Sequence, residues 1–321
     1  MPVLLSKNHG VQLMRTYWNI NHTLRTEETW QPNCWTQVTC PTNDDISFLV
    51  DELKVPEYFI EDVRDKDERS RYEYDEGWVL IILRIPYVRE VRSHTPHTTI
   101  PLGIIINKEV CVTVCNYETN MMIDFIAYQQ KRNVGFTDSV DLVFRLFLSS
   151  SVWYLKRLKQ INTLIEESKQ NLDRKIDNED LVGLSRLQDS LTYFATSIRG
   201  NEMLLSKLKF KLPVDELDAD LIEDVNIEMS QAREMTNIYT NILNSTMETY
   251  ASIINNNMSS VMKSLTSVSI ILMFPTLIAS LFGMNLINGM EDLSWGFPLI
   301  FCLSIIVTIA FVLLFRRKTW I

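Results

Sequence analysis

The sequence predicts an α+β membrane protein with an N-terminal cytoplasmic α/β domain, a long helical stalk and two C-terminal transmembrane helices. Three observations lead to this fold class. The first 135 or so residues mix short apolar runs with turn signals, a 3.6-residue apolar period begins near residue 138, and two uncharged apolar runs occupy the last 60 residues. With 321 residues, the chain is long enough for one large domain or two ordinary ones.

Residues 1–135 are expected to form the α/β domain. The runs WVLIILRIPYV (78–88) and LGIIINKEVCVTVCN (102–116) are rich in β-branched residues and predict strands. ISFLVDELKVPEYFIEDV (46–63) predicts two short helices separated near Pro56, because proline ends a helix at the preceding residue.

The cysteines and histidines of this domain do not show a metal-binding pattern. The chain has five cysteines and no CxxC pair. Cys111 and Cys115 share one face of a predicted strand, and a buried reduced pair is favoured because no histidine or third cysteine is close in sequence. His94 and His97 fall in RSHTPHTT, which reads as a polar turn, so we expect both to be solvated.

Residues 136–260 are expected to form long helices. Apolar residues follow one stripe over about 138–176 and 179–211, with charged residues elsewhere. Pro213 is expected to start a third helix, since proline suits the first helical turn. No helix breaker occurs before Pro275, so this helix would run for about 100 Å at roughly 1.5 Å per residue.

Two membrane spans are predicted near the C terminus. LTSVSIILMFPTLIASLF (265–282) and FPLIFCLSIIVTIAFVLLF (297–315) have no charged residue, and each approaches the 20 or so residues that cross a bilayer. A pair of buried core helices is the alternative. It is disfavoured because the RRK sequence stops the second run abruptly, and because Trp295 and Trp320 flank that run as interfacial residues do.

The distribution of basic residues predicts the topology. Lys263 precedes the first span and RRK (316–318) follows the second, whereas the intervening loop lacks Lys and Arg and carries Glu291 and Asp292. The positive-inside rule therefore places both termini in the cytoplasm of a multi-pass protein of the plasma (inner) membrane. No signal peptide is apparent at the N terminus. The expected segments are a first span (261–284), a short external loop (285–296), a second span (297–315) and a basic tail (316–321).

One stripe of the first span is polar where a membrane helix is normally apolar. Steps of four and three residues from Glu248 meet almost only polar, small or Met side chains. We call this set the polar stripe; it comprises Glu248, Ser252, Asn255, Ser259, Met262, Thr266, Ser269, Met273, Thr276, Ser280 and Gly283. The neighbouring stripe, which includes Val261 and Leu265, is apolar.

Polar groups at membrane depth must face protein or water. Hydroxyl groups can simply join neighbouring helices. Alternatively, several copies of the helix surround a watery path, which requires a cyclic homo-oligomer because two spans cannot enclose a pore. Hydroxyl and amide groups suit hydrated Mg²⁺, which loses its water reluctantly. Met262 and Met273 would then form narrow apolar rings where dewetting gates flow.

Other classes of function lack support in the sequence. A formal net charge of −9 disfavours a nucleic-acid-binding protein. The chain has no GxxxxGK[ST] sequence, nucleophile elbow or paired metal-ligand motif, so we expect neither an enzyme nor a bound cofactor.

The end of the first span carries a recognisable motif. Gly283-Met284-Asn285 closes the span, a short acidic loop and Trp-Gly-Phe-Pro (295–298) follow, and the chain ends in FRRKTWI. Together with MKSLT (262–266), this arrangement resembles the CorA family of magnesium transporters. The resemblance is close over about 240–321, and the rest agrees in layout.

The resemblance implies a funnel-shaped homopentamer embedded in the lipid bilayer that admits Mg²⁺, with Co²⁺ and Ni²⁺ as further candidate ions. Gly283, Met284 and Asn285 would form the selectivity filter, with Asn285 ringing the external mouth and binding hydrated Mg²⁺. Glu291 and Asp292 would attract cations there. The residues implied to line the pore are Thr276, Met273, Leu265, Met262 and Ser259, with Glu248 on the cytoplasmic side, and the polar stripe adds Ser269, Thr266 and Asn255.

The family also implies closure by cytoplasmic Mg²⁺ bound between neighbouring subunits. Asp224 matches one family carboxylate, and its partner falls at Val88-Arg89-Glu90, where Glu90 could serve although Arg89 would repel a cation. Ser259 stands where a family Asn is common, and the loop's NGMEDL lacks the common Met-Pro-Glu. Two alternatives stay open: a zinc transporter of the same superfamily, whose motif usually has Val in place of Met284, and a membrane-anchored scaffold without transport.

Overall fold

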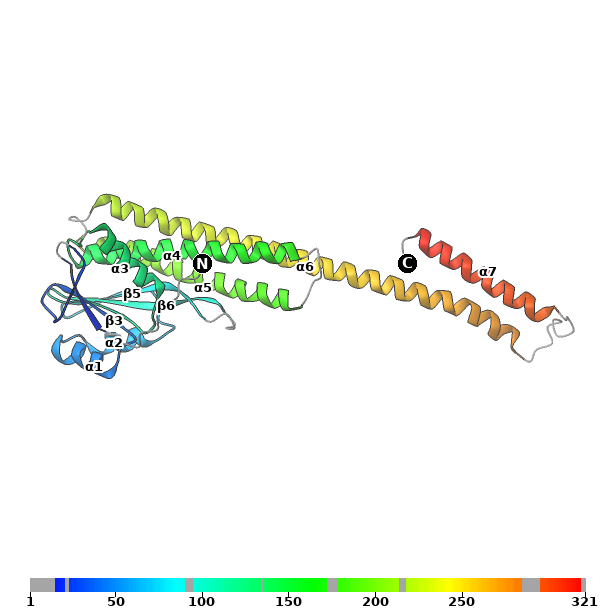
Figure 1. The fold of residues 1–321 in the computed structure, drawn as a ribbon, viewed down its shortest axis with the longest axis horizontal. Coiled ribbons are helices and arrows are strands. Elements are labelled where there is room, and N and C mark those ends of the chain that lie inside the picture. Colours follow the sequence, from blue (N-terminus) through cyan, green and yellow to red (C-terminus); the bar gives the residue numbers. More distant parts are fainter. Residues whose placement is uncertain are drawn as a thin grey trace. The chain divides into compact units, whose positions relative to one another are not determined.

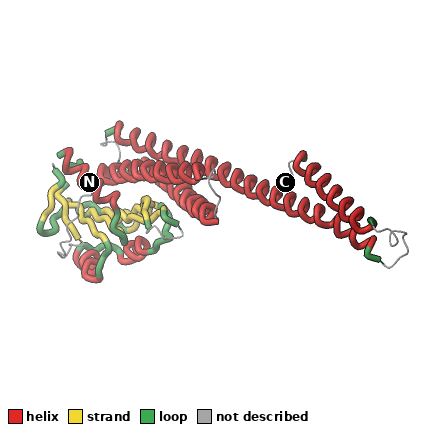
Figure 2. The backbone as a smooth tube through the Cα atoms, turned by 45° about the vertical axis from the view of Figure 1, so that its right-hand side comes forward, coloured by secondary structure: helices red, strands yellow, loops and turns green. Residues whose placement is uncertain are grey.

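The computed structural model describes residues 15–20, 23–89, 95–133, 135–171, 178–213, 218–284 and 295–318. The chain separates into two compact units, Met1–Ser245 and Thr246–Ile321. Figures 1 and 2 show a mixed sheet and long helices in the first unit, and helices in the second.

The first unit is built on a seven-stranded sheet with the order β2-β1-β3-β7-β6-β5-β4. β3 and β7 pair in parallel, and the other neighbouring strands are antiparallel. The structure confirms the strands predicted within 78–88 and 102–116. The strands are β1 (Arg15–Asn19), β2 (Arg25–Glu27), β3 (Cys34–Thr39), β4 (Arg71–Asp75), β5 (Trp78–Val88), β6 (His97–Ile106) and β7 (Cys111–Cys115).

Helices cover both faces of this sheet, as Figure 1 shows. On one face lie α1 (Asn43–Ser47), a π-helical turn (Phe48–Glu52) and α2 (Glu57–Arg64), which confirms the predicted break near Pro56. Gly103 of β6 permits close packing there, because a Cβ atom at this position would lie 2.2 Å from Val63 Cγ2 of α2. The other face carries α3 (Asn120–Arg132), α4 (Ser139–Asn171) and α5 (Asn178–Lys211).

Cys111 and Cys115 are buried free thiols in β7, as the strand pattern predicted. Burial raises the pKa of each thiol to about 12, because the thiolate is poorly solvated there. Both are therefore unreactive core residues at neutral pH. In the described part of the chain, no group of three or more His, Cys, Asp or Glu side chains is placed to hold a metal ion.

His97 is buried, so the prediction of a solvated side chain was wrong. The β5–β6 ladder extends to the pair Val88 and His97, which places His97 in a strand, and only 6% of the residue is exposed. The polar sequence around it did not reveal that α5 covers this end of β6. There, the backbone N–H of His97 donates to Ser190 Oγ at 3.4 Å, and the ring packs edge-on against Phe194. His94 lies outside the described residues.

Burial, and secondarily the positive charge of Arg157, lowers the pKa of His97 to about 4. In the unfolded chain this pKa is about 6.5, so between these values the unfolded state binds more protons than the folded state. The stability that neutral His97 confers is therefore complete above pH 6.5 and is lost as the pH falls towards 4. Between pH 6.5 and 4, protonation of His97 in the unfolded chain should therefore lower the unfolding free energy of the protein by up to about 3 kcal/mol.

The measurement is urea unfolding of the wild-type chain and of His97→Gln at pH 7, 6 and 5, followed by tryptophan fluorescence. Other groups titrate in this range, so the informative quantity is the difference in pH dependence between the two chains. Wild type should lose more stability than the variant on acidification. If the unfolding free energies of the two chains fell in parallel with pH, His97 would have the same pKa in the folded and unfolded states, contrary to this prediction.

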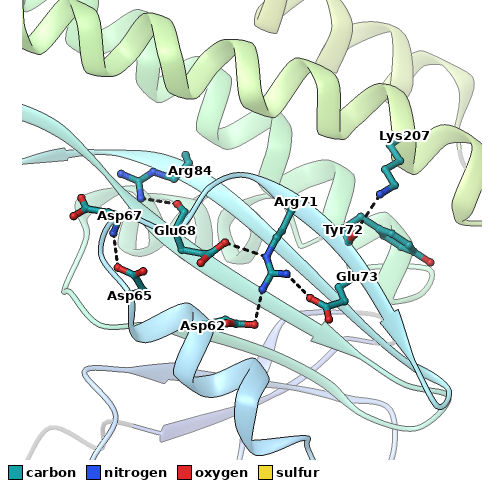
Figure 3. A network of polar contacts seen from close by, with 9 residues as sticks. All are labelled: Asp62, Asp65, Asp67, Glu68, Arg71, Tyr72, Glu73, Arg84 and Lys207. Atoms are coloured by element: carbon teal, nitrogen blue, oxygen red, sulfur yellow. Dashed lines mark hydrogen bonds and ion pairs between the residues drawn. The ribbon is translucent and has the colours of Figure 1, made fainter.

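Arg84 of β5 is buried and ties the sheet to the loop that follows α2. Its guanidinium donates to the backbone carbonyls of Lys66 (2.6 Å), Glu68 (2.9 Å) and Thr99 (2.7 Å). Burial lowers the pKa of Arg84, and among the described residues the guanidinium hydrogen-bonds to backbone carbonyls and the Thr99 hydroxyl, with no carboxylate partner. In Figure 3 the side chain of Glu68 instead points to Arg71, which also contacts Asp62 and Glu73.

The backbone of Arg84 is held by the long helices. Asn201 of α5 accepts from the backbone N–H of Arg84 at 3.1 Å and donates to its carbonyl at 2.7 Å. Tyr154 of α4 donates to the same carbonyl at 3.0 Å. Because β4 begins only at Arg71, which pairs with Ile82, Arg84 has no partner in β4, and the side chain of Asn201 takes the place of a strand partner at this edge. Arg84 therefore joins the sheet, the α2 loop and two helices.

The sixth helix, α6, spans Ala219–Phe282 and continues from the first unit into the second. It begins later than the predicted start at Pro213, which is not helical. The reason is a local cap: Asp218 Oδ1 accepts from the backbone N–H of Asp220 at 3.1 Å. The last helix, α7, spans Gly296–Arg317.

Both α6 and α7 contain a stretch long and apolar enough to cross a membrane. Almost none of either stretch is buried within the chain, in contrast to a core helix of a soluble protein. This exposure argues against the alternative of two buried core helices.

Candidate functional site

One face of α6 packs against α7 in the second unit. The rings of Phe274 and Phe311 stack with centroids 4.2 Å apart, which sets the register of the two helices. Ser267 of α6 is fully buried on this face. The partly buried residues that continue the face at helical spacing are Ile270, Ile271, Phe274 and Ile278 in α6, and Ser304, Val307, Thr308, Phe311 and Phe315 in α7.

The polar stripe lies on the other side of α6. All of its members, from Glu248 to Gly283, are exposed in the single chain. At roughly 100° per residue, the centre of the stripe is about 145° around the helix from the face that packs on α7. The chain therefore leaves its most polar membrane-depth face uncovered, and this face requires water or another protein surface.

Two hydroxyl groups of the stripe have a defined orientation. Ser269 Oγ donates to the carbonyl of Leu265 at 2.9 Å, and Thr276 Oγ1 donates to the carbonyl of Leu272 at 2.7 Å. The hydroxyl protons are thus used within the helix, and the oxygen lone pairs remain as acceptors. The waters around a dication direct their hydrogens outward, so an acceptor surface is complementary to a hydrated cation.

Large apolar side chains alternate with these hydroxyls. Met262 is 60% exposed and Met273 is 67% exposed, and both lie on the stripe. Leu265 is also 67% exposed, but it lies roughly 60° around the helix from Met262, on the edge of the stripe. The face therefore offers apolar positions at two levels, with Thr266 and Ser269 between them.

The stripe ends at Gly283, immediately after the last residue of α6. Its backbone N–H donates to the carbonyl of Ala279 at 2.9 Å, and a Cβ atom at this position would lie 3.0 Å from that oxygen. Glycine therefore suits the tight exit from the helix. Met284 is described and exposed, whereas the predicted filter residue Asn285 and the loop residues Glu291 and Asp292 lie outside the described residues.

Only one of the two predicted regulatory residues lies in the described part of the chain. Asp224 is an exposed residue of α6, and Glu90 lies outside the described residues. Arg89 is described, and its backbone N–H donates to the carbonyl of Pro96 at 2.9 Å across the β5–β6 hairpin. The second carboxylate of this site therefore has no described position.

Sequence reasoning missed the role of Ser267. This residue is polar like its neighbours, and its hydroxyl donates to the carbonyl of Lys263 at 2.8 Å, as that of Ser269 does to Leu265. Ser267 is nevertheless fully buried, and at helical spacing it shares the face of α6 that carries Phe274. The one signal in the sequence was that Ser267 does not fall on the 3.5-residue repeat of the polar stripe, so its surroundings differ from those of Ser269.

Comparison with known proteins gives a consistent result along almost the whole chain. Residues 30–317 match the family model for the CorA-like Mg²⁺ transporter protein. The cobalt/magnesium transport protein CorA of Methanocaldococcus jannaschii is 27% identical over 297 residues, covering 89% of this chain and 91% of the relative. The magnesium transport protein CorA of Helicobacter pylori is 25% identical over 299 residues, covering 89% and 90%.

The fold agrees with a solved structure. The complete structure of the CorA magnesium transporter from M. jannaschii aligns with a TM-score of 0.82 at 23% identity, covering 97% of this chain and 100% of that one. An N-terminal α/β unit, a long helix and two C-terminal apolar helices are therefore arranged in the same fold. The chain is a membrane protein with two C-terminal transmembrane helices.

Proposed function

Because this chain belongs to the CorA-like Mg²⁺ transporter family, we propose that it conducts Mg²⁺ and Co²⁺ across a membrane through a pore lined by its polar stripe. The observation that carries the proposal is the exposure of this stripe on the side of α6 opposite the α7 contact. A membrane anchor without transport would give no reason for an uncovered polar face at bilayer depth.

The proposed pore is formed by several copies of the chain. One polar face of one helix cannot enclose a path, so cyclic symmetry is needed to bring copies of the face around an axis. We assign a homopentamer in the plasma membrane with both termini in the cytoplasm. The basic residues at Lys263 and Arg316–Lys318, and their absence from the intervening loop, support this orientation.

The ion is proposed to pass with much of its water shell. Hydroxyl oxygens of Ser269 and Thr276 accept hydrogen bonds from these waters, and Met262 and Met273 form the narrow apolar levels. Asn285 closes the external mouth as the first ring that the hydrated ion meets. Membrane potential drives entry, because two charges crossing 100 mV gain about 4.6 kcal/mol.

Control by cytoplasmic Mg²⁺ is proposed through Asp224 and Glu90 of neighbouring subunits. The exposure of Asp224 on α6 supports its access to a cation and to a second subunit. Arg89, directly before Glu90 in the sequence, weakens such a site by repulsion, so closure should need more Mg²⁺ than a site with two unopposed carboxylates.

Removing the two acceptor hydroxyls tests the pore. The double variant Ser269→Ala/Thr276→Val should slow Mg²⁺ uptake into vesicles about thirtyfold, since the water shell loses hydrogen bonds worth about 1 kcal/mol each at two levels. Ser267→Ala is the matched control. It removes a hydroxyl with the same backbone hydrogen bond from the α7-facing side of α6, and uptake should stay near wild type.

Equal effects of the two substitutions would show that the polar stripe does not line the path. Absence of any ion flux from the reconstituted wild-type protein would favour the scaffold function instead. Competition by Co²⁺, Ni²⁺ and Zn²⁺ during the same uptake measurement separates magnesium transport from zinc transport.

A further inference from the structure

The end of α7 carries a cluster of positive charges. Arg316 and Arg317 form the last turn of α7, Lys318 follows, and all three are exposed. No Asp or Glu occurs within 249–284 or 295–318, so nothing in the two described membrane helices supplies an opposite charge.

A further positive charge, Lys263 of α6, lies away from the polar stripe and on the same side as the cluster. Lys263, the only charged residue of α6 after Glu248, is roughly 110° around that helix from the centre of the stripe and only about 40° from the face that packs on α7. From the Phe274–Phe311 stack, Arg317 and Lys263 both lie towards the C-terminal end of α7, about 9 Å and 16 Å along the helices. The positive charges therefore belong to the α7 side of this helix pair.

Arg316 and Arg317 border an exposed apolar stripe of α7. Ile306, Ile309 and Leu313 are 63%, 52% and 61% exposed and lie on one face at helical spacing. This face points roughly 180° away from the α6 contact, and the two arginines lie about 50° to either side of its line. A row of apolar side chains thus ends between two guanidinium groups.

We propose that this surface binds one anionic phospholipid, with an acyl chain along Ile306, Ile309 and Leu313 and the phosphodiester between Arg316 and Arg317. The occupant is identified by its two chemistries, because an apolar row suits an acyl chain and paired guanidinium groups suit phosphate oxygens. Basic residues next to a transmembrane helix are attracted to anionic lipid headgroups. Lys263 adds positive charge at the same membrane surface.

The proposal rests on membrane insertion of α6 and α7 and not on transport. Its test is native mass spectrometry of the full-length protein in detergent, titrated with phosphatidylglycerol or with phosphatidylcholine of the same acyl chains. Wild type should bind phosphatidylglycerol about tenfold more tightly. Arg316→Gln/Arg317→Gln should lose this preference, and its binding of phosphatidylcholine should not change.

Two further variants make the result specific. Arg199→Gln/Lys211→Gln removes two exposed positive charges from α5 and should keep the wild-type preference. Arg316→Lys/Arg317→Lys keeps the charge but loses the paired donors of guanidinium, so an intermediate preference is expected and remains measurable if the glutamine variant fails to fold.

Three outcomes would overturn the proposal. The first is equal binding of both lipids by wild type. The second is displacement of phosphatidylglycerol by millimolar inorganic phosphate, which would identify a site for the free anion. The third is loss of subunit assembly with an unchanged lipid preference in Arg316→Gln/Arg317→Gln, which would assign the arginines to a contact between copies.

Discussion

Replacing Asn285 by alanine is expected to abolish Mg²⁺ uptake, with a fall of at least about a hundredfold. In the proposed pore, every subunit contributes this amide to one ring at the external mouth. The substitution therefore removes several hydrogen bonds to the hydrated ion at once, each worth about 1 kcal/mol. Uptake of Mg²⁺ by vesicles containing equal amounts of assembled protein is the measurement.

The matched control is Asn257→Ala. Asn257 is an exposed asparagine of α6 that lies roughly 140° around the helix from Met262, away from the polar stripe. The same loss of an amide there should leave uptake near the wild-type rate. If Asn285→Ala conducts normally, Asn285 has no place in the mechanism, and the filter must be built from other residues.

Replacing Arg84 by methionine is expected to lower the unfolding free energy by about 3 kcal/mol. Methionine fills much of the space but donates no hydrogen bond, so the carbonyls of Lys66, Glu68 and Thr99 lose their buried donors. The loss also loosens the α2 loop from the sheet edge that Asn201 and Tyr154 hold. Urea unfolding of the full chain, followed by tryptophan fluorescence, measures the effect.

Arg64→Met serves as the control because Arg64 is an exposed residue at the end of α2. Its stability should change by no more than about 0.5 kcal/mol. Similar unfolding midpoints for Arg84→Met and Arg64→Met would mean that water replaces the guanidinium at the three carbonyls, and that Arg84 contributes little to the fold.

Periodic patterns in the sequence predicted most of the elements. The β-branched run at 78–88 became β5, and the two uncharged runs became the membrane parts of α6 and α7. These predictions succeeded because burial in a sheet or a bilayer imposes a period or a length on local sequence. The start of α6 was placed too early, at Pro213, because the pattern did not reveal that the side chain of Asp218 caps the helix.

The candidate site was predicted in part. The polar stripe follows from a 3.5-residue repeat, and the structure shows that it is exposed and opposite the α7 contact. Sequence could not reveal that Ser267 is buried, because this depends on where α7 lies. His97 was misjudged for a similar reason, since α5, more than 80 residues later, covers it.

By itself, the sequence determined the order of elements, the two membrane spans and the presence of a hydroxyl-rich stripe, because these depend on residues close together in the chain. Only the tertiary structure decided which face of α6 stays uncovered, that Arg84 is held by three backbone carbonyls, and that Arg316 and Arg317 border an apolar row. The physical reason is that the environment of a side chain is set by packing partners that are distant in sequence, and a local pattern does not identify those partners.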